Sequence, residues 1–347
     1  MSPVVLGRQG EWGILERAQK APASLLVLYG PPHVGKTSLL SQWADHLQCN
    51  QPVQIVFWTA TTLSGAFQLA DFSSAIRRVE TTQPESVSAE VPFLNWETAL
   101  RALAERADRL TGEHTLVVIL DRFTDLIHAD RRVLGAFQSA WTQRLVTSER
   151  LRLILCGSSG SEAGRQLLNV SQSLPGNVTV LPVRPHSFPA LPDWLPDWTI
   201  EERLAAYGVG AGLPAVARLL GRESSFEQGL FEYALTPSAT LIDHVRSFLR
   251  NTPDITPLCE SVLAVLARQG HDLESLTAAV YGRPSDVARC LNTLEAVEWV
   301  ESRKPGLPAR KAVPSVFVLR EPTLRLFYRW ILPERTAIQR GLPGVTT

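Results

Sequence analysis

The sequence predicts an α/β core, a parallel sheet with helices on both faces, followed by helical segments and a small C-terminal unit of helices and a hairpin. In the first half, apolar, β-branched runs alternate with amphipathic helical patterns, which is typical of a parallel sheet buried on both faces. The predicted strands are Leu25–Tyr29, Gln54–Ala60, Thr115–Leu120 and Leu151–Cys156, with Val178–Leu181 as a candidate fifth. The predicted helices of this core are Ser38–Leu47, Phe67–Val79, Trp96–Leu110 and Val133–Thr147.

Composition excludes several classes of protein. The 347 residues are 45% hydrophobic and 20% charged, and 34 basic side chains balance 34 acidic ones. A neutral chain has no overall positive field that would draw it onto nucleic acid or an anionic membrane. The four cysteines form no C-x-x-C pair, and no apolar run approaches the length of a membrane span. Without a signal-peptide pattern, we expect a reduced, cytoplasmic protein with no membrane partner.

The run Gly30–Thr37 follows the first predicted strand and fits G-x-x-x-x-G-K-[ST], the phosphate-binding P-loop. In such a loop, Lys36 reaches the β- and γ-phosphates and the Thr37 hydroxyl binds Mg²⁺. The N-terminus of the next helix adds a partial positive charge. The alternative, a glycine turn beside a surface lysine, does not account for the strand before the loop and the helix after it. The predicted nucleotide-binding residues of the loop and the first helical turn are Gly30, Pro31, Pro32, His33, Val34, Gly35, Lys36, Thr37 and Ser38.

Asp121 ends the apolar strand that begins at Thr115, as the second metal-site acid of a P-loop ATPase does. We expect its carboxylate beside the Thr37-bound Mg²⁺, usually through water; the alternative is an aspartate that caps a helix. Hydrolytic members of this class usually place an acid directly after the metal acid, but this chain has Arg122, which cannot accept a proton. Asp125, one helical turn on, is a candidate substitute. The sequence therefore predicts slow or absent hydrolysis.

The strand Leu151–Cys156 is followed by Gly157, Ser158 and Ser159. Ser158 or Ser159 is a candidate sensor that hydrogen-bonds the γ-phosphate or the attacking water. The alternative is a simple turn that closes a core strand.

The pattern divides the chain into a core at 1–198, a helical lid at 199–256, a winged helix-turn-helix at 257–320 and a tail at 321–347. The proline-rich segment 182–198 is predicted to hold no regular structure. The winged-helix prediction depends on three short helices followed by two strands. These elements are Leu258–Arg268, Leu273–Val280, Pro284–Val297, Trp299–Arg303 and Ser315–Leu319.

DNA contact by this unit is one of two open alternatives. The third helix offers Arg289, but Asp286 and Glu295 leave that helix close to neutral, so its attraction for phosphate is weak. The wing is more basic, because it carries Arg303, Lys304, Arg310 and Lys311. The other alternative is a role in protein interaction or intramolecular docking.

Motifs along nearly the whole chain resemble the archaeal-type ATPase family, a branch of the STAND nucleotide switches within the AAA+ superfamily. They are Leu6–Leu15, Tyr29–Leu39, Val118–Phe123, Leu153–Ser159, Tyr207–Pro214 and Arg320–Pro333. The resemblance implies ATP and Mg²⁺ as ligands, an N-terminal segment containing Arg8 near the adenine, and Pro214 near the base.

The chain departs from that family at two places that serve hydrolysis. Arg122 replaces the usual glutamate, and 173–178 lacks an arginine that is a candidate finger to a neighbour's γ-phosphate. We therefore expect an ATP-binding molecular switch with weak or absent hydrolysis, which controls engagement of DNA, another protein or a second copy. The alternative is a DNA-binding AAA+ ATPase that resembles origin or transposition loaders.

Overall fold

The computed structural model describes residues 6–78, 91–250, 252, 254–304 and 315–341. The chain forms two compact units. The first contains residues up to Gly30 and Lys36–Val183, and the second contains Pro31–Gly35 and the residues from Arg184 onward. Within the described residues, no helix is both long and apolar enough to cross a membrane.

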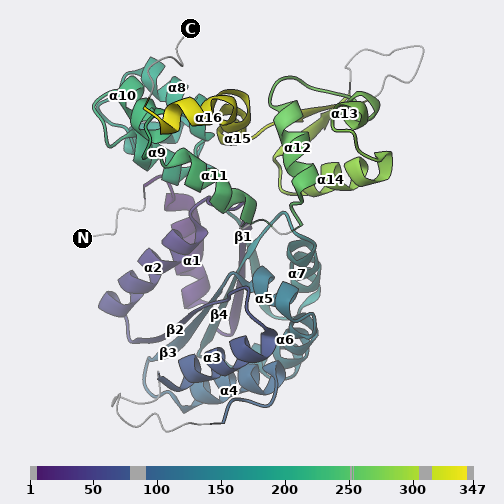
Figure 1. The fold of residues 1–347 in the computed structure, drawn as a ribbon. Helices are drawn as coiled ribbons and strands as arrows, with labels where there is room; N and C mark the ends of the chain where they lie inside the picture. The colour runs from purple at the N-terminus through teal and green to yellow at the C-terminus, as the bar shows by residue number, and fades with distance from the viewer. Residues whose placement is uncertain (1–5, 79–90, 251, 253, 305–314, 342–347) are drawn as a thin grey trace. The chain divides into compact units, whose positions relative to one another are not determined.

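A five-stranded parallel sheet forms the centre of the first unit, in the order β2–β3–β4–β1–β5 (Figure 1). All five predicted strands are confirmed, and each differs from its predicted bounds by one or two residues at most. They are β1 (Ser24–Gly30), β2 (Val53–Thr59), β3 (Thr115–Asp121), β4 (Leu151–Ser158) and β5 (Asn177–Pro182). The inner strands β1, β3 and β4 are buried almost along their whole length, which explains their continuous apolar runs.

Helices cover both faces of this sheet. On one face lie α1 (Gln9–Lys20) and α2 (Lys36–Asn50), with Leu15 and Trp43 buried beneath them. The helices on the other face share one apolar cluster with the strands, which includes Phe72 and Trp141. They are α3 (Gly65–Arg78), α4 (Trp96–Arg109), α5 (Phe123–Ala129), α6 (Arg132–Gln143) and α7 (Glu162–Ser173), and a 3₁₀ turn, η2 (Leu145–Thr147), follows α6.

The second unit is mainly helical and has a single apolar core. Its first part contains the 3₁₀ helix η3 (Phe188–Asp193), α8 (Ile200–Gly210), α9 (Pro214–Leu220), α10 (Phe226–Leu230), the π-helical turn η4 (Phe231–Leu235) and α11 (Leu241–Arg250). The 3₁₀ helix corrects the prediction that 182–198 holds no regular structure. Pro189 occupies the first turn of η3, where a missing N–H costs no hydrogen bond, and Leu191 anchors the turn in the core.

Three helices and a hairpin follow in the predicted order: α12 (Pro257–Leu266), α13 (Leu273–Ala279), α14 (Pro284–Ala296), and the antiparallel strands β6 (Val300–Arg303) and β7 (Val316–Leu319). The predicted tip of the hairpin, including Arg310 and Lys311, lies outside the described residues.

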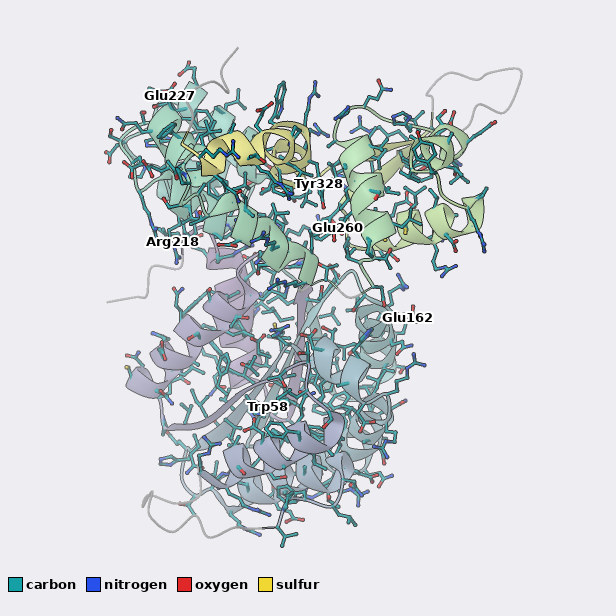
Figure 2. All side chains as sticks on the ribbon, viewed as in Figure 1. Trp58, Glu162, Arg218, Glu227, Glu260 and Tyr328 are labelled. Carbon is teal, nitrogen blue, oxygen red and sulfur yellow. The ribbon has the colours of Figure 1, made fainter. Side chains whose placement is uncertain are left out.

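The chain-terminal helices pack into the same core as the rest of the second unit. These are α15 (Pro322–Leu326), the π-helical turn η5 (Phe327–Ile331) and α16 (Leu332–Gln339). The Thr323 hydroxyl donates to the Val209 carbonyl of α8 at 3.0 Å. The Tyr328 hydroxyl donates to Glu260 of α12 at 3.4 Å, and both side chains are labelled in Figure 2. The segment from α15 to η5 therefore makes hydrogen bonds to both α8 and α12.

Candidate functional site

The chemistry-bearing residues of the first unit lie at the carboxyl ends of three neighbouring strands. Gly30 ends β1, Asp121 ends β3 and Ser158 ends β4, and the β1–β4 register places Gly30 opposite Ser158. Because the strands are parallel, these ends meet at one edge of the sheet, where ligands of open α/β folds bind. The topology thus brings together three predicted site residues that are far apart in the sequence.

Thr37 and Asp121 form a hydrogen-bonded pair. The Thr37 hydroxyl, in the first turn of α2, donates to Asp121 Oδ2 at 2.8 Å, and Asp121 is 1% exposed. A hydroxyl and a carboxylate are hard oxygen ligands of the kind Mg²⁺ takes, and Mg²⁺ usually binds one or two protein groups together with phosphate oxygens. Among the described residues, no cluster of three or more acidic, histidine or cysteine side chains could hold a metal. The pair therefore fits a Mg²⁺ ion that also binds nucleotide phosphates better than a metal ion whose ligands all come from the protein.

Lys36 lies in the core of this site. Its Nζ donates to the Gly30 carbonyl oxygen at 2.9 Å, so the side chain turns back toward the start of the loop. Burial lowers the pKa of Lys36 from its ordinary value, and nearby Cys156, Asp121 and Asp125 oppose that shift. A buried ammonium gains from the arrival of an anion, because phosphate charge would offset its lost hydration.

Backbone geometry explains the two glycines of the loop. A β-carbon at Gly30 would lie 2.1 Å from the Val183 carbonyl oxygen, so the chain that leaves β5 passes directly against the start of the loop. Gly35 has a φ of +93°, a region that side chains other than glycine rarely adopt. Both positions accept only glycine without a shift of the backbone.

The tip of the loop, Pro31–Gly35, is grouped with the second unit, and His33 and Gly35 lie next to residues of that unit. The His33 ring lies 4.2 Å from the Phe248 ring and 5.6 Å from the His244 ring, centroid to centroid, both on α11. His33 itself has a left-handed φ of +62°. A β-carbon at Gly35 would lie 3.6 Å from the predicted base-side residue, Pro214, at the start of α9. Sequence reasoning gave no sign of the aromatic contacts, because nothing in the loop motif specifies them.

Arg122 and Asp125 form an ion pair at the start of α5. Arg122 has a left-handed φ of +56°, and its Nε donates to Asp125 Oδ2 at 2.7 Å. Burial raises the pKa of Asp125 above its ordinary value, although Arg122 acts in the opposite direction. The one nearby carboxylate that the sequence offered as a substitute base is therefore partly occupied by the arginine that replaces the usual acid.

The turn after β4 is held by hydrogen bonds from its backbone amides. The Ser158 amide donates to the Thr124 hydroxyl of α5 at 3.2 Å, and the Ser159 amide donates to the Gly30 carbonyl oxygen at 3.1 Å. A β-carbon at Gly157 would lie 2.7 Å from Thr124 Cγ2, so Gly157 allows α5 to approach this closely. The sensor role of Ser158 remains a prediction. The placement of the turn next to the loop is what such a role requires.

Cys156 is buried next to Lys36 and Asp121, and its burial raises the pKa of its thiol well above the usual range. Such a thiol stays neutral and unreactive, as expected for a small core residue.

A family model for an ATPase domain found predominantly in Archaea matches residues 12–186. The chain belongs to this family. The match spans the whole sheet and every site residue of the first unit described above. Family membership supports nucleotide binding by this archaeal-type ATPase.

Solved structures share the fold over almost the whole length of this ATPase. The Walker-type ATPase PABY2304 of Pyrococcus abyssi is similar with a TM-score of 0.63 and 16% identity, covering 94% of this chain and 96% of the other. The ORC2 protein of Aeropyrum pernix, solved as ADPNP and ADP complexes, is similar with a TM-score of 0.59 and 16% identity, covering 96% of both chains. At this identity the likeness establishes the fold alone.

A curated relative extends the comparison of this ATPase at the level of sequence. The uncharacterized protein MJECL04 of Methanocaldococcus jannaschii is 24% identical over 326 residues, which cover 91% of this chain. The matched region spans 66% of that relative's length, so the relative is the longer protein.

The remaining predicted residues of this ATPase lie on other elements of the chain. Arg8 is buried just before α1, where it forms an ion pair with Glu11 at 2.8 Å. In the second unit, Arg289 pairs with Asp286 at 2.7 Å and Arg303 pairs with Glu301. Lys304 is exposed at the end of β6. Of the three described basic residues that were predicted to contact DNA, Arg289 and Arg303 thus already pair with an acidic residue of the same helix or strand.

Proposed function

We propose that this protein is an ATP- and Mg²⁺-binding switch of the STAND/AAA+ type that hydrolyses ATP slowly or not at all. One observation carries the proposal. The residues for binding, Lys36, Thr37 and Asp121, lie together, whereas the position after Asp121 holds Arg122 instead of an acid.

The binding half of the proposal follows from the contacts of the first unit. Lys36 would exchange its bond to the Gly30 carbonyl oxygen for phosphate oxygens, which carry full negative charge and accept stronger, charge-assisted bonds. Thr37 and Asp121 would hold the magnesium ion, directly or through water. When bound, Mg²⁺ neutralises charge on the β- and γ-phosphates.

The slow-turnover half depends on Arg122 and Asp125. A guanidinium cannot orient and deprotonate water as a carboxylate does. Asp125 has a raised pKa, which suits a base, but its Oδ2 accepts from Arg122 at 2.7 Å. The nucleotide state would then persist long enough to control which partner the second unit engages, as a switch requires.

Purified protein should bind ATP tightly in the presence of Mg²⁺. It should release phosphate more slowly than about 0.01 s⁻¹, which is the range of nucleotide switches that act without an activating partner. Calorimetry measures the affinity, and a phosphate-release assay measures the turnover. Chelation of Mg²⁺ should weaken ATP binding, because Thr37 and Asp121 act through the ion. Turnover of about 1 s⁻¹ or faster by the chain alone would contradict the proposal.

A second function, duplex DNA binding through α14 and the hairpin, is supported by the basic residues at the end of β6. It predicts duplex affinity that falls with salt and that weakens when Arg310 and Lys311 are both changed to glutamate. Because Arg289 and Arg303 already pair with acids, we expect little binding even at low salt in a fluorescence anisotropy titration. Clear salt-sensitive binding that the double variant loses would instead favour the DNA-binding function.

A further inference from the structure

The outer edge of β2 lies between two helices, α2 and α3. β2 is the first strand in the sheet order and pairs with β3 on its inner side. Among the described residues, no strand pairs with its outer side. An edge of this kind presents backbone N–H and C=O groups that can pair with an added strand.

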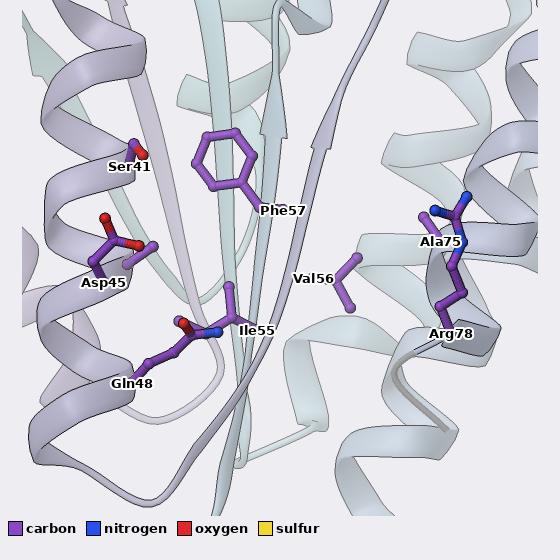
Figure 3. Close-up of a pocket in the computed structure, with 9 residues that line it drawn as sticks. Ser41, Asp45, Gln48, Ile55, Val56, Phe57, Ala75 and Arg78 are labelled. Carbon is purple, nitrogen blue, oxygen red and sulfur yellow. The ribbon is translucent and has the colours of Figure 1, made fainter. Parts of the chain in front are cut away.

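A cavity of about 400 Å³ follows this edge, with α2 on one wall and α3 on the other. Figure 3 shows Ile55 and Phe57 pointing from β2 towards α2, and Val56 pointing towards α3. Ile55 and Phe57 are half-buried and Val56 is buried. The opening therefore lies in the plane of the sheet, where a sixth strand would lie, and its floor is apolar.

The two walls carry opposite charges. Asp45 of α2 lines one side of the cavity and Arg78 of α3 lines the other (Figure 3). Both residues are exposed, and the Arg78 side chain, 65% exposed, reaches Asp71 only at 4.0 Å. At that distance and exposure the pair is weak, so Arg78 can turn to another carboxylate with little loss.

We propose that the β2 edge binds an extended segment of another protein in which a basic residue and an acidic residue are adjacent. Successive side chains of a strand point to opposite faces of a sheet. An added strand therefore places one neighbour against Asp45 and the next against Arg78. Backbone pairing with β2 supplies affinity, and the two charged walls supply the sequence preference, as in other cases of β-strand addition. This surface is separate from the P-loop, so the inference does not depend on the proposed switch.

The test uses three fluorescent octapeptides with identical Thr and Val flanks and a central Lys-Glu, Lys-Lys or Glu-Glu pair. The full-length protein should bind the Lys-Glu peptide at least about fivefold more tightly than either like-charged peptide, since each of those places one charge against a like charge. N-methylation of alternate amides on one edge of the Lys-Glu peptide should abolish binding, and methylation of the other edge should not.

Two charge variants sharpen the test. D45K makes both walls basic and should transfer the preference to the Glu-Glu peptide, whereas R78E should transfer it to the Lys-Lys peptide. Both positions are exposed, so we expect unchanged thermal unfolding. The proposal would be overturned if the three peptides bound with equal affinity or if both variants kept the same preference. It would also be overturned if no peptide bound at about 1 mM, which we take as the weakest affinity that would support a specific site. Peptide-free dimerisation that either variant disrupts would also overturn it, because the occupant would then be a second copy.

Discussion

ATP binding is expected to weaken by at least about a hundredfold when Lys36 is replaced by alanine, a loss of about 3 kcal/mol. The ammonium is buried beside Asp121, and the structure places it on the Gly30 carbonyl oxygen at the start of the loop. Without it, the phosphates would enter a site that contains the Asp121 carboxylate but lacks the compensating cation. Isothermal titration calorimetry with ATP and Mg²⁺ measures the loss.

The matched control for this experiment is K20A, which removes the same charge from the exposed end of α1. K20A should bind ATP as the wild type does. K36A should unfold at the same temperature as the wild type or higher without nucleotide, because burial of an ammonium is itself unfavourable. ATP should raise the unfolding temperature of the wild type and of K20A but not that of K36A. An equal ATP-induced shift in K36A would show that nucleotide binds elsewhere.

The sheet and the phosphate loop could be predicted because local sequence determines them. A strand buried on both faces must be apolar along its length, and Asp121 stands out as the polar residue that ends such a run. The order of the strands in the sheet was not predicted, because parallel strands joined by helices can be arranged in several orders. The loop motif and the apolar run that ends at Asp121 predicted that Asp121 lies near Thr37, and the structure places the Thr37 hydroxyl 2.8 Å from Asp121 Oδ2.

Other features depend on contacts between distant residues, and no local pattern encodes them. The short helix α5 is preceded by Arg122 in a left-handed conformation, which no propensity favours, and Arg122 forms an ion pair with Asp125. The contact of His33 with Phe248 joins a loop residue to a helix more than two hundred positions away, and neither residue is unusual for its own element. The sequence pattern does not predict the 3₁₀ helix Phe188–Asp193, because prolines usually interrupt regular structure, although they suit a first helical turn.

Turnover is expected to increase about 10- to 100-fold in R122E, while ATP affinity changes by less than about fivefold. A glutamate at this position supplies the proton acceptor that the site lacks, and positioned bases contribute about 10²- to 10⁴-fold in enzymes that have them. We expect the lower part of that range, because the new carboxylate lies close to Asp125 and Asp121, and like charges raise carboxyl pKa values. Single-turnover phosphate release with saturating ATP and Mg²⁺ measures the change.

Two companion variants separate the possible causes of that gain. R122Q removes the cation without adding a base, so it should leave turnover within about threefold of the wild type if the missing acid limits hydrolysis. R122Q with turnover equal to R122E would mean that release of Asp125 from its ion pair is what matters, and D125N in the same background should then abolish the gain. If neither R122E nor R122Q exceeds the wild type, the limit lies elsewhere, such as the absent arginine in 173–178, and Arg122 does not set the slow turnover. The three rates together therefore decide whether this residue keeps the nucleotide state long-lived.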